Sequence, residues 1–113
     1  LIISSFVFMG MHLGNPNIGM LPIANLFLAG IFLGVYRIHK NNLWFPIGAH
    51  LMWNYLQGPI YGFEVSGNKI NSLFEQKLKG HEVLTGGNFG YEGSIILTVF
   101  LIISIYLMDK RFR

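Results

Sequence analysis

Apolar residues gather in four stretches along the chain, and polar or glycine-rich segments separate them. The stretches are residues 1–13, 21–36, 45–57 and 94–108. Their length and their flanking glycine, proline, asparagine and basic residues predict helices. The first stretch is shorter than the roughly 20 apolar residues that cross a bilayer. We therefore expect a truncated first helix, with residues 1–113 forming the C-terminal part of one larger helical domain.

The links between these stretches carry turn signals and most of the charge. Residues 14–17 read Gly-Asn-Pro-Asn, and residues 37–42 form a short basic connection. The long polar link covers residues 64–92, and its 70–78 portion predicts a short amphipathic helix lying in a membrane interface. The glycine-rich end of this link predicts a tight turn before the last apolar stretch.

The composition favours a membrane protein. Hydrophobic residues make up 52% of the chain and charged residues only 12%, whereas soluble domains carry about 25% charged residues. The pattern therefore predicts an all-α fold, an integral membrane helical bundle of about four apolar segments. The chain has no cysteine, which excludes disulfides and cysteine-based metal sites. No basic run alternates with exposed aromatic residues, so nucleic acid is not an expected partner.

The basic residues predict the orientation of this bundle in the bilayer. Arg37 and Lys40 follow the second stretch, and residues 110–113 follow the fourth. With stretches three and four each crossing once, both basic groups fall on one side, which the positive-inside rule makes cytoplasmic. The chain is then a multi-pass cell-membrane protein whose 64–92 link lies on the opposite side.

The third stretch carries the strongest functional signal. His50, Asn54 and Gln57 are spaced to share one face of a helix, and Pro46 suits the first turn of that helix. Polar groups on a membrane helix are costly unless they face a bundle interior or a wet cavity, which marks a functional site. The alternative is that the three side chains only join helices through hydrogen bonds.

The second stretch is almost wholly apolar. Asn25 is its one strongly polar interior residue. Gly30 and Gly34 are four residues apart, a spacing that lets membrane helices approach closely, and we interpret them as packing positions.

Two of the four histidines stand out because they lie in apolar stretches. His39 is in the basic connection and His81 in the long polar link, and both are expected to be solvated. His12 and His50 lie on different predicted helices, where two imidazoles can bind one metal ion or polarise one water molecule.

No carboxylate lies inside an apolar stretch. Glu64 and Glu92 lie at the ends of the long link, and Asp109 follows the last stretch. The chain by itself is therefore expected to lack a buried general base. Glu92 and Ser94 precede the last helix closely enough for either side chain to cap it.

These residues resemble a known family. Phe8-x-x-x-His12, followed by Leu-Gly-Asn-Pro, resembles the second motif of the CPBP intramembrane proteases, the CAAX prenyl protease and bacteriocin-processing proteins also called the Abi family. His50-x-x-x-Asn54, within Leu-Trp-Phe-Pro-Ile-Gly-Ala-His, resembles the third motif. The similarity extends over nearly all of the chain. The family's first motif, a Glu-Glu pair followed by Arg, is absent, as expected for the C-terminal part of a longer protein.

The resemblance implies an intramembrane endopeptidase in the full-length parent. A glutamate of the missing motif would activate a water molecule held by His12 and His50, or a metal ion carried by those two histidines. Asn54 would donate a hydrogen bond to the oxyanion, and Phe8 would fix the rotamer of His12. Zinc and a metal-free, glutamate-driven reaction both suit this set. The partners implied are the lipid bilayer and a peptide or protein substrate reached from the membrane.

Two other functions stay open at this point. One is a non-catalytic membrane immunity or interaction protein on the same scaffold, which a parent lacking the Glu-Glu motif would favour. The other is a small transporter with His12 and His50 along a proton or metal path. That reading calls for a stripe of polar residues along the last apolar stretch, and this stretch has no such stripe.

A shared site for the two histidines makes a geometric prediction. His50 lies about four residues past Pro46, roughly 6 Å from the basic end of its helix. His12 must reach the same depth, so the first helix has to end within the membrane zone. Residues 14–17 would then form a buried or re-entrant connection. The imidazole nitrogens should approach within about 4–7 Å of one another, which lets them share a water molecule or a metal ion.

Overall fold

The computed structural model describes residues 1–113 as an all-α fold, which confirms the all-α part of the predicted fold class. The α-helices are α1 (Ile2–Gly10), α2 (Met20–Lys40), α3 (Trp44–Tyr55), α4 (Glu82–Thr85) and α5 (Ile95–Phe112). Shorter helical turns are η1 (Leu56–Ile60, a π-helix), η2 (Gly87–Phe89) and η3 (Tyr91–Gly93). The only β interaction is an isolated bridge between Val65 and Asn68.

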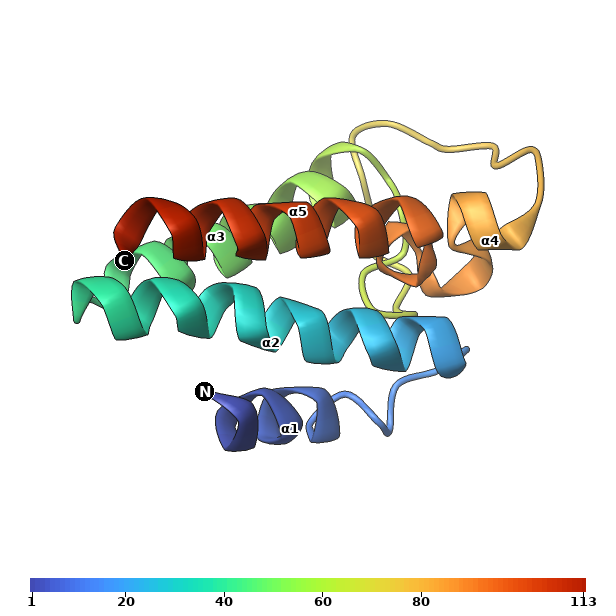
Figure 1. The fold of residues 1–113 in the computed structure, drawn as a ribbon. Helices are drawn as coiled ribbons and strands as arrows, with labels where there is room; N and C mark the ends of the chain where they lie inside the picture. Colours follow the sequence, from blue (N-terminus) through green and yellow to red (C-terminus); the bar gives the residue numbers. More distant parts are fainter.

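The long helices α2 and α5 lie side by side and run in the same direction, and α1 packs antiparallel on another side of α2 (Figure 1). The helix α3 returns from the end of α2 behind α5 (Figure 1). The fully apolar part of the core is small and lies mainly between α2 and α5, where Leu26, Val35, Leu97 and Leu101 are buried. Many other large apolar side chains on these helices are exposed.

One helix is long and apolar enough to cross a membrane. This is α2, Met20–Lys40, with 21 residues. The 18 residues of α5 include Asp109, Lys110 and Arg111 in its last turns. The four-segment membrane bundle therefore stays a prediction, supported by α2 alone on this criterion.

The glycines of α2 let α1 approach it closely, as their spacing predicted. A Cβ atom on Gly30 would lie 2.8 Å from the backbone Cα of Ser5, and one on Gly34 would lie 2.6 Å from the Leu1 side chain. The Ser5 side chain itself is fully buried in this contact. The interpretation of Gly30 and Gly34 as packing positions is confirmed.

The basic connection predicted at residues 37–42 is mostly helix. α2 continues to Lys40, and the link to α3 is only residues 41–43. Basic residues are favourable in the last turn of a helix, where carbonyl dipoles point outward. The helix ends where Asn41 adopts a left-handed conformation, φ 49°, which asparagine tolerates better than most residues.

The amphipathic helix predicted at residues 70–78 is wrong, because this segment is irregular. The Leu73 and Phe74 amides donate to the carbonyls of Pro59 and Ile60, at 2.8 and 3.1 Å. These carbonyls lie in the last turn of η1, where helical carbonyls lack partners within the helix. These amides therefore bond to the end of η1 instead of forming the hydrogen bonds of a helix.

The two basic ends of the chain lie together, on the side where the last turns of α2 and α5 meet. His39 Nε2 lies 3.0 Å from a carboxylate oxygen of Asp109, and Lys40 lies 4.2 Å from the ring centroid of Phe112. The expectation that His39 is solvated is wrong, because its side chain is only 18% exposed and bonded to α5. His81 is exposed, as predicted, and its ring accepts a hydrogen bond from Val83 N at the start of α4.

Candidate functional site

His12 lies just beyond the end of α1, in a turn, with its ring returned over the helix. Its Nδ1 atom lies 2.7 Å from the carbonyl oxygen of Phe8. Because a carbonyl only accepts hydrogen bonds, Nδ1 carries the proton and Nε2 keeps a free lone pair. The rings of Phe8 and His12 are 4.8 Å apart between centroids. The four-residue spacing of Phe8 and His12 therefore fixes both the orientation and the tautomer of this imidazole.

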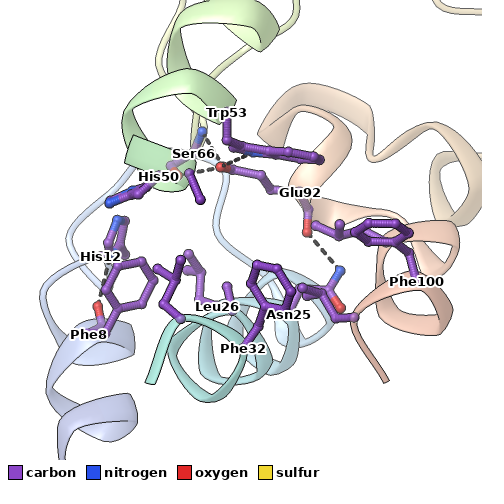
Figure 2. A pocket seen from close by; sticks show the side chains of 15 residues that line it. Phe8, His12, Asn25, Leu26, Phe32, His50, Trp53, Ser66, Glu92 and Phe100 are labelled. Atoms are coloured by element: carbon purple, nitrogen blue, oxygen red, sulfur yellow. Dashed lines mark hydrogen bonds between the residues drawn. The ribbon is translucent and has the colours of Figure 1, made fainter. Parts of the chain in front are cut away.

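His50 lies in the middle of α3 and reaches the same aromatic ring. Its centroid is 5.2 Å from that of Phe8, in an edge-on arrangement. The imidazoles of His12 and His50 point their nitrogen-bearing edges toward one another beside Phe8 (Figure 2). The structure thus brings together the two histidines that the sequence placed on different helices.

The two histidines can meet because α1 is much shorter than α2. α1 ends at Gly10, and residues 11–19 continue without an α-helix to the start of α2 (Figure 1). The early end of the first helix agrees with the geometric prediction. The residues of the 14–17 turn are mostly exposed in this chain, so the burial predicted for that turn is not found here.

Asn54 lies beside His50 rather than in the cavity. Its Nδ2 atom is 3.4 Å from His50 Nε2, and its Oδ1 atom is buried without a partner. Gln57 is tied elsewhere, because its Nε2 atom donates to the carbonyl of Glu64 at 2.6 Å. Of the predicted polar face, His50 and Asn54 therefore form one unit, and Gln57 joins η1 to the following loop.

A cavity of about 260 Å³ extends from the two imidazoles between α2, α3 and α5. Most of its lining is apolar, including Phe8, Leu26, Phe32 and Phe100 (Figure 2). Its polar lining consists of His12, Asn25, His50, Trp53, Ser66 and Glu92. The two histidines thus sit at one part of a mainly apolar chamber.

Glu92, at the end of the polar link, is buried beside the cavity. It is 7% exposed and lines the cavity, so the chain holds one buried carboxylate next to the histidines. One oxygen accepts from Trp53 Nε1 at 3.1 Å, and the other accepts from Ser66 N at 2.7 Å and Ser66 Oγ at 2.5 Å. With three donors on its two oxygens, this carboxylate is poorly placed to act as a free general base. The sequence signal for this buried position was a single glutamate between Gly90 and Gly93, just before an apolar helix.

Asn25 is the second residue whose importance the sequence did not reveal. It is 1% exposed, and its Nδ2 atom donates to the carbonyls of Glu92 and Ser94 at 2.7 and 2.9 Å. Its Oδ1 atom accepts from Thr98 Oγ1 at 2.6 Å. Ser94 Oγ in turn caps α5 by accepting from Leu97 N at 3.2 Å, as predicted. The signal for Asn25 was its isolation as the one polar residue in an apolar stretch.

The donor set for a metal ion is incomplete within residues 1–113. No group of three histidine, aspartate or glutamate side chains is arranged to hold an ion. Catalytic zinc uses three protein ligands and an open position. The two imidazoles alone therefore do not fit a zinc site.

The half of the chain that carries both motifs matches a known family. Residues 1–56 match the family model described as type II CAAX prenyl endopeptidase Rce1-like. This stretch holds Phe8, His12, His50 and Asn54, the residues of both motifs. Neither a curated protein nor a solved structure matches the chain. The resemblance seen in the sequence is confirmed: residues 1–56 are similar to the Rce1-like family, a membrane-embedded protease family.

Proposed function

We propose that this chain supplies the two-histidine part of an intramembrane endopeptidase site, which hydrolyses peptide bonds at or in the membrane with an activated water. The observation that carries the proposal is the meeting of both motif histidines against one Phe8 ring. They come from segments about forty positions apart, and both line one cavity. The match of residues 1–56 to the Rce1-like family model supports the same chemistry.

His12 has a defined role in this proposal. The Phe8 carbonyl holds the proton on Nδ1, so Nε2 accepts a hydrogen bond from the water. Attack of the water oxygen on the substrate carbonyl carbon then requires a base to take the water proton. His50, whose ring faces His12, holds the water from the other side (Figure 2).

Asn54 has two amide hydrogens and therefore two possible tasks. One N–H points to His50 Nε2, at a donor–acceptor distance of 3.4 Å, and orients that ring. The second is proposed to donate to the oxyanion that forms on the attacked carbonyl. A donor of this kind contributes about 2.7–4 kcal/mol to transition-state stabilisation.

The general base is proposed to come from the Glu-Glu motif in a longer parent protein. Glu92 is the one carboxylate lining the cavity, and its oxygens already accept three hydrogen bonds. That observation favours a second candidate for a parent lacking the motif: a non-catalytic membrane protein that binds through the same cavity. The upstream sequence separates the two candidates directly.

The experiment that tests the proposal is proteolysis by the full-length parent in membranes, with a set of membrane-inserted reporter peptides. His50→Ala should abolish cleavage, and Asn54→Ala should reduce it by about 10²–10³-fold. His81→Ala, at an exposed histidine, is the matched control. Cleavage by the His50→Ala protein at the control rate would refute the proposed chemistry, whether or not a metal ion takes part.

The proposed orientation in the cell membrane can be tested separately. Arg37, Lys40 and the C-terminal Lys110–Arg113 group are proposed to face the cytoplasm, because positive charge is retained there. The ends of α2 and α5 that carry them lie together in the structure. The chain has no cysteine, so single cysteines at positions 40 and 75 report one side each. Labelling of position 75 from the cytoplasm alone would reverse the proposed topology.

A further inference from the structure

Three segments that surround the cavity meet at the Glu92 side chain. Trp53 belongs to α3, Ser66 to the loop after η1, and Glu92 itself to η3, just before α5. All three side chains line the cavity beside the histidines (Figure 2). No cation is paired with Glu92, and the three hydrogen bonds from Trp53 and Ser66 are its partners.

Trp53 links this carboxylate to His50. The two residues are three positions apart on α3, so their side chains project from neighbouring points on one face of the helix. The side chains of α3 make few other hydrogen bonds. Asn54 bonds only to His50, which belongs to the same helix. The hydrogen bond from Trp53 Nε1 to Glu92, at 3.1 Å, therefore ties the side chains of α3 to another part of the fold.

The pattern of donors and acceptors requires a carboxylate at position 92. Trp53 Nε1, Ser66 N and Ser66 Oγ all donate, and both oxygens of Glu92 accept. A glutamine would have to turn its NH₂ group toward either the indole N–H or the two Ser66 donors. Two donors then face each other, and at least one of the bonds is lost.

We propose that Glu92 is a positioning residue: its carboxylate holds the Trp53 indole, and through it the rotation of α3 that aims His50 at His12. The proposal rests on the proposed function of the same site. It assigns Glu92 neither proton transfer nor substrate contact. It explains why a charged side chain is buried in a mainly apolar cavity, where such burial is costly unless the charge is hydrogen-bonded.

The test is nuclear magnetic resonance of the ¹⁵N-labelled 113-residue chain in detergent micelles. The chain has two tryptophans, and Trp44 is 80% exposed, so its indole signal is an internal control for Trp53. In Glu92→Gln, the Trp53 indole proton should move upfield and exchange with solvent roughly ten-fold faster or more, as expected for loss of a hydrogen bond to a charged group. The His50 ring signals should move as well, while those of exposed His81 stay in place.

A second variant separates positioning from charge and from misfolding. Trp53→Phe keeps an aromatic side chain and the Glu92 carboxylate but removes the indole N–H, and it should move the His50 signals as Glu92→Gln does. In the double variant the two effects on the His50 signals should be less than additive, because each substitution removes the same Trp53–Glu92 hydrogen bond. Glu75→Gln, at an exposed glutamate without a side-chain partner, is the matched control.

Unchanged His50 signals in Trp53→Phe would overturn the proposal, even if Glu92→Gln unfolds the chain. Movement of the Trp53 signal without movement of His50 in Glu92→Gln would overturn it too. These readouts do not depend on proteolysis. A parent protein that cleaves no peptide would refute the proposed function and leave this result intact.

Discussion

The helices α2 and α5 are joined by polar contacts at two places, and the two joints are very different. Beside the cavity, Asn25 of α2 bonds to Glu92, Ser94 and Thr98 through an amide that is 1% exposed. At the other end, His39 bonds to Asp109, whose side chain is 34% exposed. The first joint uses neutral groups away from water, and the second uses an imidazole–carboxylate hydrogen bond whose carboxylate is partly exposed.

This difference indicates which contact determines the arrangement of α2 against α5. A buried amide with every partner supplied allows one arrangement of the helices, because any shift leaves polar groups unpaired in an apolar surrounding. A partly exposed contact such as His39–Asp109 is weakened by solvent, and the Asp109 carboxylate can bind water when the contact breaks. We infer that the Asn25 joint sets the register of α2 against α5, and that the Asp109 joint adds little to stability.

Breaking the buried joint should have the largest effect. Asn25→Leu keeps the side-chain size but leaves the Glu92 and Ser94 carbonyls without this donor. The free energy of unfolding should fall by on the order of 3 kcal/mol, because each orphaned buried group costs about 1–3 kcal/mol. Thr98 Oγ1 keeps its contact to the Ser94 carbonyl at 3.3 Å, which limits the loss. Denaturant titration in detergent measures it.

The control for this variant is Asn71→Leu, at an exposed asparagine. Equal stability of the Asn25→Leu and Asn71→Leu proteins would show that the buried amide does not specify the helix pair.

The next largest effect concerns how α1 is held near the site. α1 relies on close approach to α2 at Gly30 rather than on a buried amide, and Gly30→Ala places a methyl group 2.8 Å from the Ser5 Cα atom. Overpacking of this kind costs about 1–3 kcal/mol, since backbone has to move. Because α1 leads directly to His12, the same change should reduce proteolysis in the parent protein.

Gly48→Ala in α3 is the matched control, because its Cβ atom would meet nothing within 4 Å. It should be neutral or stabilise by roughly 0.5–1 kcal/mol, the gain of alanine over glycine in a helix. A Gly30→Ala protein as stable as Gly48→Ala would mean that α1 is free to move on α2.

The smallest effect is expected at the surface joint, and it depends on pH. The hydrogen bond from His39, and then that from Arg113, lowers the pKa of Asp109 from its ordinary value of 3.8. A lowered pKa in the folded protein means that the carboxylate stabilises the fold above pH 3.8. That contribution is lost as the pH falls through the lowered pKa. Asp109→Asn should therefore lower the melting temperature slightly at neutral pH and not at all in strong acid.

Thermal unfolding of the two proteins across this pH range measures the difference. A gap between them that widens in acid would contradict the sign of this linkage, and Glu75→Gln serves as the exposed control.

The sequence predicted the parts of this molecule that depend on local spacing. The four-residue spacing of Phe8 and His12, and of His50 and Asn54, predicted the two local side-chain contacts that the structure shows. The packing of Gly30 and the cap at Ser94 follow from equally local rules.

The parts that could not be predicted depend on contacts between distant segments. Glu92 is buried only because Trp53 and Ser66, 39 and 26 positions away, supply its donors. The 70–78 segment has an amphipathic pattern, but the free carbonyls at the end of η1 hold Leu73 and Phe74 in another conformation. His39 has a partner, Asp109, 70 positions later. In each case a tertiary hydrogen bond overrides the local preference.

The central claim is that His12 and His50 share one site, and cross-linking tests it most directly. The chain has no cysteine, so His12→Cys/His50→Cys carries two thiols and no others. Treated with a short bismaleimide in detergent, this protein should form an intramolecular cross-link in high yield, whereas the control His12→Cys/His81→Cys should not. Equal, low yields from both pairs would contradict the shared site.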